Sequence, residues 1–416
     1  MNPFAKRRKK LSQLIGDGLV IISNRLRDTQ DRNTESKKYD NNFFYLTGLT
    51  KPNSLLVLDT NTHHATFFGS EKQPQEEIWL GEQLNPQDIK AQHGFDKAYC
   101  INELDSQLLS ILTQQRTVFW PIGSDPILDK KLAHYKIQHH NLLDTLSAMR
   151  LIKDKVEIQH LKTAGKISAL AHQHAIKTIR PEQYEYQIES ELLYQFMQQG
   201  TRLTAYESII ASGKNACTLH YSENSAQLKS GELLLIDAGC KWQGYTSDIT
   251  RTVPVNGRFN SIQKIVYEIV LEAQLAAIRT IRPHVNCQEI ERAALNILVQ
   301  GMVDLKLLNG SIEGIIENKT YQQFYMHGIG HWLGLDVHDV GEKMSQPDLK
   351  LLPNMCLAVE PGLYIRPNPD IPTALHHIGI RIEDDILVTQ TGCEVYTASD
   401  VPKSVQSIED MMRGTT

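Results

Sequence analysis

Two aspartates in the second half of the sequence have the spacing of a metal or acid–base pair. Asp237 ends the apolar run Leu233–Ile236, and Asp248 follows eleven residues later. A turn centred between Trp242 and Gln243 predicts that the two aspartates lie opposite each other on paired strands. Such carboxylates, about 4 Å apart, repel by roughly 4 kcal/mol at an effective dielectric constant of 20. A shared proton, a cationic side chain or a metal ion would offset this repulsion. An exposed hairpin with screened charges would also tolerate it.

Three histidines within twelve residues form a second group of potential ligands. His327, His331 and His338 lie in the segment FYMHGIGHWLGLDVHD, in which Gly328 and Gly330 disfavour a helix. The four-residue spacing of the first two histidines therefore does not indicate the HExxH helix of zinc peptidases. A glycine-rich backbone instead allows a ligand to approach closely. Single histidines are more often structural, but this cluster predicts a functional site.

Two glutamates stand at the ends of predicted strands. Glu360 precedes the Pro-Gly turn in LAVEPG, and Glu383 ends the alternating segment IGIRIE. The isoleucines of that segment share one face of a strand, so Arg381 and Glu383 share the other. Arg381 is therefore placed to steady a neighbouring carboxylate. A solvated strand face with an ordinary ion pair would give the same pattern.

The elements that must position these residues fall into two predicted domains. Residues 1–148 contain apolar runs of strand length, such as Leu19–Ile22 and Leu55–Leu58, between helical or polar stretches, which predicts an α/β domain. Residues 149–416 predict a mixed α+β domain. Its expected helices cover residues 154–179, 262–281 and 287–302, and its expected strands cover residues 232–238, 246–255, 355–360 and 378–388.

The composition indicates a globular enzyme of two or three domains. The chain has 416 residues, of which 41% are hydrophobic, and 43 Lys and Arg against 48 Asp and Glu. This acidic balance argues against a nucleic-acid partner, and no apolar stretch in the sequence approaches the roughly 18 residues of a membrane span. We therefore expect neither nucleic acid nor membrane as a partner. Six scattered cysteines without a CxxC pair favour reduced thiols and a cytoplasmic location.

The two ends of the sequence carry polar segments. The run KRRKK at residues 6–10 is not followed by the uninterrupted apolar region that a signal peptide requires. It predicts a short helix with a solvated basic face and with Leu11, Leu14 and Ile15 facing inward. The residues after Val401 predict a polar tail.

The motifs, taken in order, resemble those of the dinuclear metallopeptidases with the pita-bread fold. The greatest similarity is to the Xaa-Pro aminopeptidases (aminopeptidase P). The segments DAGCKWQGYTSDITRTVPVNGRF, FYMHGIGHWLGLDVHDVG and GIRIEDD carry the resemblance, together with residues 210–224 around His220. NFFYLTG and EIWLG in the first 100 residues are also similar. The resemblance covers nearly the whole chain and implies a pita-bread (creatinase/aminopeptidase) catalytic domain over residues 149–416.

The resemblance implies two divalent metal ions, for which an oxygen-rich ligand set favours Mn²⁺. The implied ligands are Asp237, Asp248, His331, Glu360 and Glu383, with Asp248 and Glu383 bridging the two ions. Four carboxylates then balance the charge of two dications. The implied reaction is attack of a metal-bridging hydroxide on the bond before proline, which releases the N-terminal residue of the peptide.

The resemblance also implies roles for residues around the metals. Glu360 would shuttle a proton, and Arg381 would orient Asp237. Three histidines would bind substrate and stabilise the tetrahedral intermediate: His220, His327 and His338. The implied partners are peptides with N-terminal Xaa-Pro and further copies of the chain in a homo-oligomer, in which Trp79 would help to shape a neighbour's site.

Two other functions are weighed against this one. A prolidase, which cuts only Xaa-Pro dipeptides, has the same fold, but prolidases of the bacterial type usually carry an insertion between the VHD and VEPG motifs. The connection here is short. A metal-free binding protein or a creatinase-like hydrolase would have lost ligand carboxylates that this sequence retains. One departure from the aminopeptidase P pattern bears on peptide length: residues 341–353 contain Lys343 and Lys350 where the family carries arginines.

Overall fold

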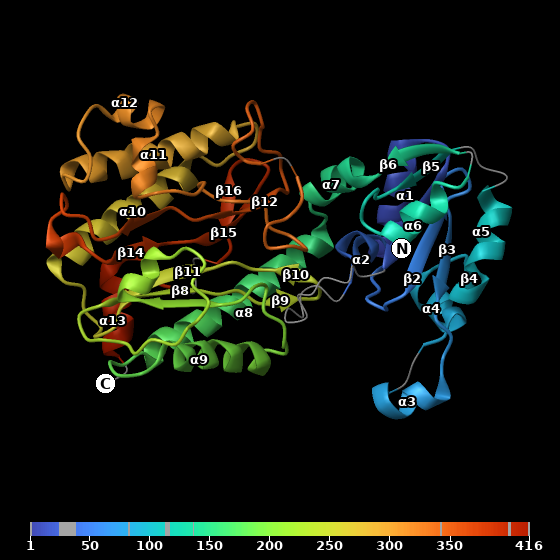
Figure 1. Cartoon of the computed structure of the whole chain (residues 1–416), viewed down its shortest axis with the longest axis horizontal. Coiled ribbons are helices and arrows are strands. Elements are labelled where there is room, and N and C mark those ends of the chain that lie inside the picture. The colour runs from blue at the N-terminus through green and yellow to red at the C-terminus, as the bar shows by residue number, and fades with distance from the viewer. Residues whose placement is uncertain are drawn as a thin grey trace. The chain divides into compact units, whose positions relative to one another are not determined.

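The chain folds into two compact units, Met1–Arg150 and Leu151–Thr416. The computed structural model (Figure 1) describes residues 2–24, 39–81, 84–112, 117–135, 137–341, 343–397 and 401–414. In this part of the chain no helix combines the length and the apolar character needed to cross a bilayer.

The first unit is built on a six-stranded mixed sheet with the strand order β4-β3-β2-β1-β5-β6. The pairs β1–β2 and β2–β3 are antiparallel, whereas β3–β4, β1–β5 and β5–β6 are parallel. The strands are β1 (Leu19–Asn24), β2 (Ser54–Asp59), β3 (His64–Gly69), β4 (Lys97–Cys100), β5 (Thr117–Trp120) and β6 (Gln138–Asn141). The helices are α1 (Pro3–Ile15), α2 (Asn41–Thr47), α3 (Pro74–Leu80), α4 (Pro86–His93), α5 (Leu104–Leu112), α6 (Pro126–Leu132) and α7 (Leu143–Leu151). The predicted α/β class of this part of the chain is thereby confirmed.

The basic run near the N-terminus is solvated only in part: Lys6, Lys9 and Lys10 are exposed as the sequence predicted, but its two arginines are not. Arg7 and Arg8 of α1 are buried. Arg8 donates a hydrogen bond of 2.9 Å to the carbonyl of Leu46, and burial lowers the pKa of its guanidinium to about 10. Leu11 faces the core as expected, but Leu14 is 57% exposed. The helix is therefore rotated so that two arginine stems cover apolar surface while their head groups bond to backbone carbonyls.

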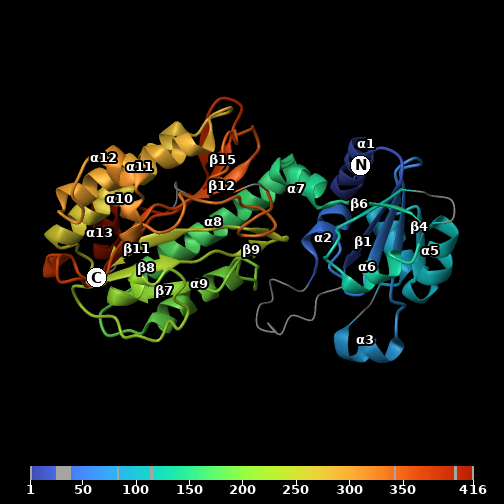
Figure 2. The ribbon, with the colours of Figure 1, turned by 45° about the horizontal axis from the view of Figure 1, so that its top comes forward.

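The second unit arranges its strands between two pairs of long helices. Figures 1 and 2 show α8 and α9 on one side of these strands and α10 and α11 on the other. The helices are α8 (Lys155–Thr178), α9 (Glu185–Gln198), α10 (Ser261–Thr280), α11 (Cys287–Asp304), α12 (Ile312–Glu317) and α13 (Val405–Arg413). The strands pair in four groups, with the orders β11-β8-β7, β10-β9, β12-β15-β16 and β13-β14. They are β7 (Ile209–Ser212), β8 (Leu233–Asp237), β9 (Lys241–Trp242), β10 (Tyr245–Thr246), β11 (Thr250–Pro254), β12 (Cys356–Val359), β13 (Gly362–Ile365), β14 (Ile378–Arg381), β15 (Asp384–Val388) and β16 (Cys393–Val395).

The three predicted long helices of this unit are confirmed to within two residues at each end. Helix α8 begins at Asp154, whose side chain accepts hydrogen bonds from the first turn in a capping box with Glu157. The predicted polar tail is wrong, because residues 405–413 form α13. This helix buries Val405, Ile408 and Met412, and their spacing of three and four residues is that of an amphipathic helix.

The hairpin that carries the two aspartates has a different register from the predicted one. Asp237 pairs with Thr250, so the turn is centred between Gln243 and Gly244 and not one residue earlier. Both turn residues have positive φ angles, 49° and 88°, as a two-residue hairpin turn requires. Asp248 is therefore displaced by two residues from the position opposite Asp237. Because side chains alternate with a period of two, the shift leaves both aspartates on the same face.

Gly239 occupies the place opposite Asp248, where the two arms of the hairpin approach most closely. A Cβ atom at this position would lie 1.8 Å from the carbonyl oxygen of Ser247. We expect Gly239→Ala to lower the free energy of unfolding by about 1–3 kcal/mol, the usual cost of forcing extra atoms into a packed site. Equilibrium unfolding in urea measures this change.

Gly392→Ala is the control, because a Cβ there meets nothing within 4 Å. Equal unfolding midpoints for the two variants would contradict the prediction.

Candidate metal centre

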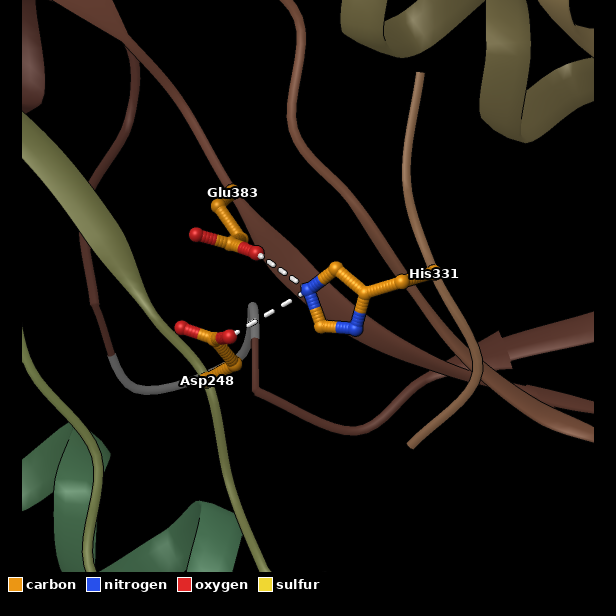
Figure 3. A group of neighbouring side chains, drawn as sticks. All are labelled: Asp248, His331 and Glu383. Carbon is orange, nitrogen blue, oxygen red and sulfur yellow. Dashed lines mark ion pairs between the residues drawn. The ribbon is translucent and has the colours of Figure 1, made fainter. Parts of the chain in front are cut away.

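His331 lies at the centre of a group of carboxylates. Its Nε2 atom is 3.4 Å from Asp248 Oδ2 and 3.7 Å from both Glu360 Oε1 and Glu383 Oε1. Figure 3 shows the carboxylates of Asp248 and Glu383 pointing toward the imidazole ring. The ligand atoms of Asp248, His331 and Glu383 all lie within 4.8 Å of one another, which is close enough for them to share one metal ion. The structure thus brings together residues that are up to 135 positions apart in the sequence.

The segment that carries His331 has no helix, as its glycines predicted, and lies along strand β12. The amide of Ala358 donates to the carbonyl of His331 at 2.9 Å, and the amide of Glu360 donates to the carbonyl of Ile329 at 2.8 Å. Gly330 allows this approach, because a Cβ there would lie 1.9 Å from the carbonyl oxygen of Ala358. Backbone packing therefore fixes the position of His331 relative to Glu360.

Tyr206, which the sequence analysis did not identify, connects the two aspartates. Its hydroxyl bonds to Asp237 Oδ1 at 2.7 Å and also to Asp248 Oδ1. Burial and the neighbouring carboxylates raise the pKa of Tyr206 well above its usual value, so the phenol keeps its proton. Because a phenol has one proton to donate, a second proton or a cation is needed to satisfy both carboxylates. No local spacing pattern marked Tyr206, which lies just before a buried strand.

Arg381 is the cation nearest to Asp237. Its Nη2 atom is 2.5 Å from Asp237 Oδ2, and its Nη1 atom donates to the hydroxyl of Tyr364 at 3.0 Å. Burial opposes ionisation of Asp237, but the Arg381 charge and the hydrogen bonds to Tyr206 and Arg381 hold its pKa below the usual value. The alternative of a solvated strand face is wrong here, because the Arg381 and Glu383 side chains are only 5% and 2% exposed.

Among the described residues, no Lys or Arg forms an ion pair with Asp248, Glu360 or Glu383, whose ion-pair partners are histidines. Burial and the charge of Glu383 raise the pKa of Asp248 to about 8, and the same two causes raise the pKa of Glu360 well above its usual value. Glu383 Oε1 is buried without a hydrogen-bond partner. Unpartnered oxygen atoms and carboxylates that resist ionisation fit a site built for cations. The residues present therefore fit two divalent ions with oxygen-rich ligands.

His327 borders this group of carboxylates. Its ring nitrogens lie 2.8 Å from the hydroxyl of Tyr364 and 2.9 Å from the carbonyl of Gly328, and its Nδ1 atom is 3.8 Å from Glu360 Oε2. Burial and the Arg381 charge lower the pKa of His327 to about 4. The imidazole is therefore neutral at pH 7.

His338 and His220 complete the set of histidines that the sequence analysis selected. The ring of His338 contacts the ring of His331 edge-on at a centroid distance of 4.3 Å. Burial and the nearby charges of His331 and His220 lower the pKa of His338 to about 4. His220 is exposed, and its charge also acts on His327. His327 and His338 thus border the group of carboxylates and His331, and His220 acts electrostatically on both of them.

Comparison with known proteins identifies similar sequences along nearly the whole chain. Residues 159–390 match the model of metallopeptidase family M24, and residues 4–120 match the aminopeptidase P N-terminal domain. Xaa-Pro aminopeptidases from Haemophilus influenzae and Escherichia coli are 39% and 37% identical to this chain over 98% of its length, and the matches cover 96% and 97% of those proteins.

Solved structures agree with these sequence matches. The structure of Zn-substituted E. coli aminopeptidase P in complex with product is 36% identical, with a TM-score of 0.94, and covers 100% of this chain and 98% of its own. The structure of Pseudomonas aeruginosa aminopeptidase PepP is 38% identical, with a TM-score of 0.92, and covers 99% of this chain and 98% of its own.

The raised pKa of Asp248 predicts how the metal-free protein responds to pH. A carboxyl group with a pKa of about 8 in the folded state and about 4 when unfolded binds its proton more tightly in the folded state. Its contribution to stability is therefore fully present below about pH 4 and is lost as the pH rises from there through about 8. We expect the thermal midpoint of chelator-treated protein to fall between about pH 4 and 8 and to level off above that, and added Mn²⁺ to reverse the fall.

Asp248→Asn removes this titrating group and should reduce the decline. An identical pH profile for wild type and Asp248→Asn would contradict the prediction.

Proposed function

The chain belongs to metallopeptidase family M24, and we propose that Asp237, Asp248, His331, Glu360 and Glu383 hold two divalent metal ions in it. It is an Xaa-Pro aminopeptidase, a hydrolase that removes the N-terminal residue from peptides with proline in the second position. The expected pita-bread fold of the catalytic domain is confirmed. The metal proposal rests on one observation: three carboxylates lie within 3.7 Å of His331 Nε2.

The metal ions would activate water and the substrate carbonyl, and the surrounding side chains would transfer protons. Divalent ions held by these five residues would lower the pKa of a water molecule and polarise the scissile carbonyl. Glu360, whose side chain is 21% exposed, is the residue that would pass a proton to the departing proline nitrogen. Burial and the charge of Glu383 raise the pKa of Glu360, which favours its protonated form and so its use as a proton donor.

The residues around the carboxylates bind the substrate and orient a metal ligand. We assign substrate contacts to His220, His327 and His338, of which the last two are neutral at pH 7 and so add no charge to the cationic site. Arg381 is a positioning residue, because its guanidinium holds the carboxylate of Asp237 in one orientation. Proline lacks an N–H group and has a fixed φ angle, so a pocket shaped for its ring selects this peptide bond.

Mn²⁺ is the proposed physiological ion. Four carboxylates and one imidazole form a hard ligand set, and such sets suit Mn²⁺ better than metals that prefer thiolates. A cytoplasmic location is supported by the cysteines, all six of which are free thiols and thus suit a reducing compartment.

A prolidase, the alternative function, would differ from the aminopeptidase in cutting only dipeptides. Only 20 residues lie between Asp339 and Glu360, and this short connection favours the aminopeptidase. We expect chelator-treated protein to regain cleavage of Ala-Pro-Ala on addition of Mn²⁺ and to prefer this tripeptide to the dipeptide Ala-Pro. Strong preference for the dipeptide would favour prolidase, and full activity without any divalent ion would contradict the metal proposal.

Glu360→Gln should lower kcat by about 10²–10⁴, the usual contribution of a general acid or base. Glu313→Gln, on the exposed surface of α12, is the matched control and should leave kcat unchanged.

Helix α3 of the first unit supports the proposed homo-oligomer. It lies apart from the sheet of its unit (Figure 2), and Ile78 and Trp79 are 82% and 86% exposed. Large exposed apolar side chains at one place often mark an interface, and we propose that Trp79 packs at a neighbour's site.

We expect Trp79→Ala to dissociate the oligomer in sedimentation velocity and to raise KM. Ile122→Ala, at another exposed apolar position, is the control, and an unchanged sedimentation coefficient for Trp79→Ala would contradict the proposal.

A further inference from the structure

A buried carboxylate on helix α9 binds both ends of the segment that carries His220. Glu185 is the first residue of this helix, and its side chain is fully buried. The helix dipole favours a negative charge in the first turn. Even so, a buried carboxylate remains costly unless other groups donate hydrogen bonds to it.

The Oε1 atom of Glu185 binds the start of the segment. It accepts hydrogen bonds from the amide and the hydroxyl of Ser212, both at 2.7 Å. The side-chain amide of Asn215 donates to the same oxygen at 3.1 Å. Ser212 is the last residue of β7, which pairs with β8, so this oxygen is attached to a fixed part of the unit.

The Oε2 atom of Glu185 binds the end of the segment. It accepts from the hydroxyl of Tyr221 at 2.7 Å and from the amide of Ala226 at 2.9 Å. Burial and the hydrogen bond to Glu185 raise the pKa of Tyr221, so the phenol keeps the proton that it donates. One carboxylate thus links two stretches of backbone that are 14 positions apart.

The segment needs this link because it has little regular structure of its own. Residues 218–226 form neither helix nor strand, and His220 is exposed. Packing of the imidazole ring therefore does not fix its position, and the backbone around it must do so. Tyr221 is the next residue along the chain, so the bond from its hydroxyl to Glu185 acts directly beside His220.

Other contacts hold the two ends of this irregular stretch. Arg366 donates to the carbonyl of Cys217 at 2.8 Å. Asn224 is buried and donates to the carbonyl of Ser208 at 2.8 Å. The Tyr221 hydroxyl is therefore an anchor in the middle of the stretch, between these two contacts.

The position of His220 matters because its charge acts on the two other histidines assigned to the substrate. It contributes to the lowered pKa of both His327 and His338. These two rings border the proposed metal ligands. A shift of the backbone around His220 would therefore change its place relative to the peptide that those rings contact.

We infer that Glu185 is a positioning residue, which sets the place of His220 against the substrate. This inference rests on the proposed function and on the substrate contact assigned to His220. Glu185 acts through Tyr221 and the backbone of residues 218–226, and not by contact with the peptide.

Glu185→Gln tests this role with little change of shape. A carboxylate has two accepting oxygens, whereas an amide has one oxygen and one NH₂ group that only donates. In either orientation this NH₂ group faces a backbone N–H, of Ser212 or of Ala226, and neither can turn into an acceptor. Because Ser212 is fixed in a paired strand, we expect the end at Tyr221 and Ala226 to detach.

We expect Glu185→Gln to lower kcat/KM of the Mn²⁺-loaded enzyme for Ala-Pro-Ala by roughly ten- to hundredfold, because misplacement by about 1 Å can cost about a hundredfold in rate. Its Mn²⁺ content should equal that of the wild type, since Glu185 contacts none of the five proposed ligands. Glu191→Gln is the matched control on the same helix, where the carboxylate pairs with His174 of α8 at 2.6 Å. It should keep the wild-type kcat/KM.

A double-mutant cycle with His220→Ala separates positioning from general destabilisation. If Glu185 acts through His220, Glu185→Gln should lower kcat/KM by less than about threefold once the imidazole is absent, because the two effects are then not additive. A purely structural role would give the same factor in both backgrounds. Tyr221→Phe should behave like Glu185→Gln with a smaller factor, and it replaces Glu185→Gln in the cycle if that variant does not fold.

Hydrogen exchange gives a readout besides activity. In the Mn²⁺-loaded protein, the amides of residues 218–226 should exchange faster in Glu185→Gln than in the wild type, whereas Glu191→Gln should leave them unchanged.

The outcomes distinguish this inference from the proposed function. If the wild type hydrolyses no Xaa-Pro peptide, the proposed function fails, and the inference fails with it. If the wild type is active but Glu185→Gln keeps its kcat/KM, loses Mn²⁺ or leaves the exchange of residues 218–226 unchanged, the inference alone is overturned. Equal factors in the presence and absence of His220 would overturn it as well.

Discussion

Repulsion among buried carboxylates is the constraint on which the second unit depends. Arg381 pairs with Asp237, whereas the ion pairs of Asp248, Glu360 and Glu383 among the described residues are with histidines alone. Burial raises the pKa of Asp248 and of Glu360, and the charge of Glu383 raises both further, because two charges in a buried site repel by several kcal/mol. Segments from opposite ends of the unit converge here against this repulsion, which protonation of a carboxylate or bound cations would relieve.

Asp384, the residue after Glu383, is a buried acid that does pair with cations of the chain. Asp384 accepts hydrogen bonds from Arg251 at 2.7 Å and from Lys403 at 2.8 Å. These two cations outweigh the effect of burial and lower the pKa of Asp384 to about 2. Arg251 also donates to the carbonyl of Glu383 at 2.6 Å, and Thr250 donates to the Glu383 carboxylate at 2.7 Å. Two cations thus pair with Asp384, whereas in the described part of the chain no Lys or Arg forms an ion pair with Glu383.

Local patterns predicted most elements and singled out Asp237, Asp248, His331, Glu360 and Glu383 as candidates, and the resemblance to the family implied their role as ligands. Local patterns failed where the decisive partner is distant in sequence. The turn residue Gln243 adopts a positive φ angle that non-glycine residues rarely adopt, so the hairpin register was misplaced. Arg8 is buried because a carbonyl 38 positions away accepts its hydrogen bond. Tyr206 bridges two carboxylates 31 and 42 positions away, a relation that no short window of sequence contains.

Two glycines explain how irregular segments can hold ligands in place. Gly239 lies against the carbonyl of Ser247, next to Asp248, and Gly330 lies against the carbonyl of Ala358, next to His331. A side chain at either position would separate the two backbones, since its Cβ would come within 2 Å of a carbonyl oxygen. Close backbone packing therefore fixes the positions of these ligands, as a helix or a long strand would in other sites. Because such packing needs no ligand, the imidazole and the carboxylates are already arranged before a cation binds, and binding does not have to overcome the entropy of ordering them.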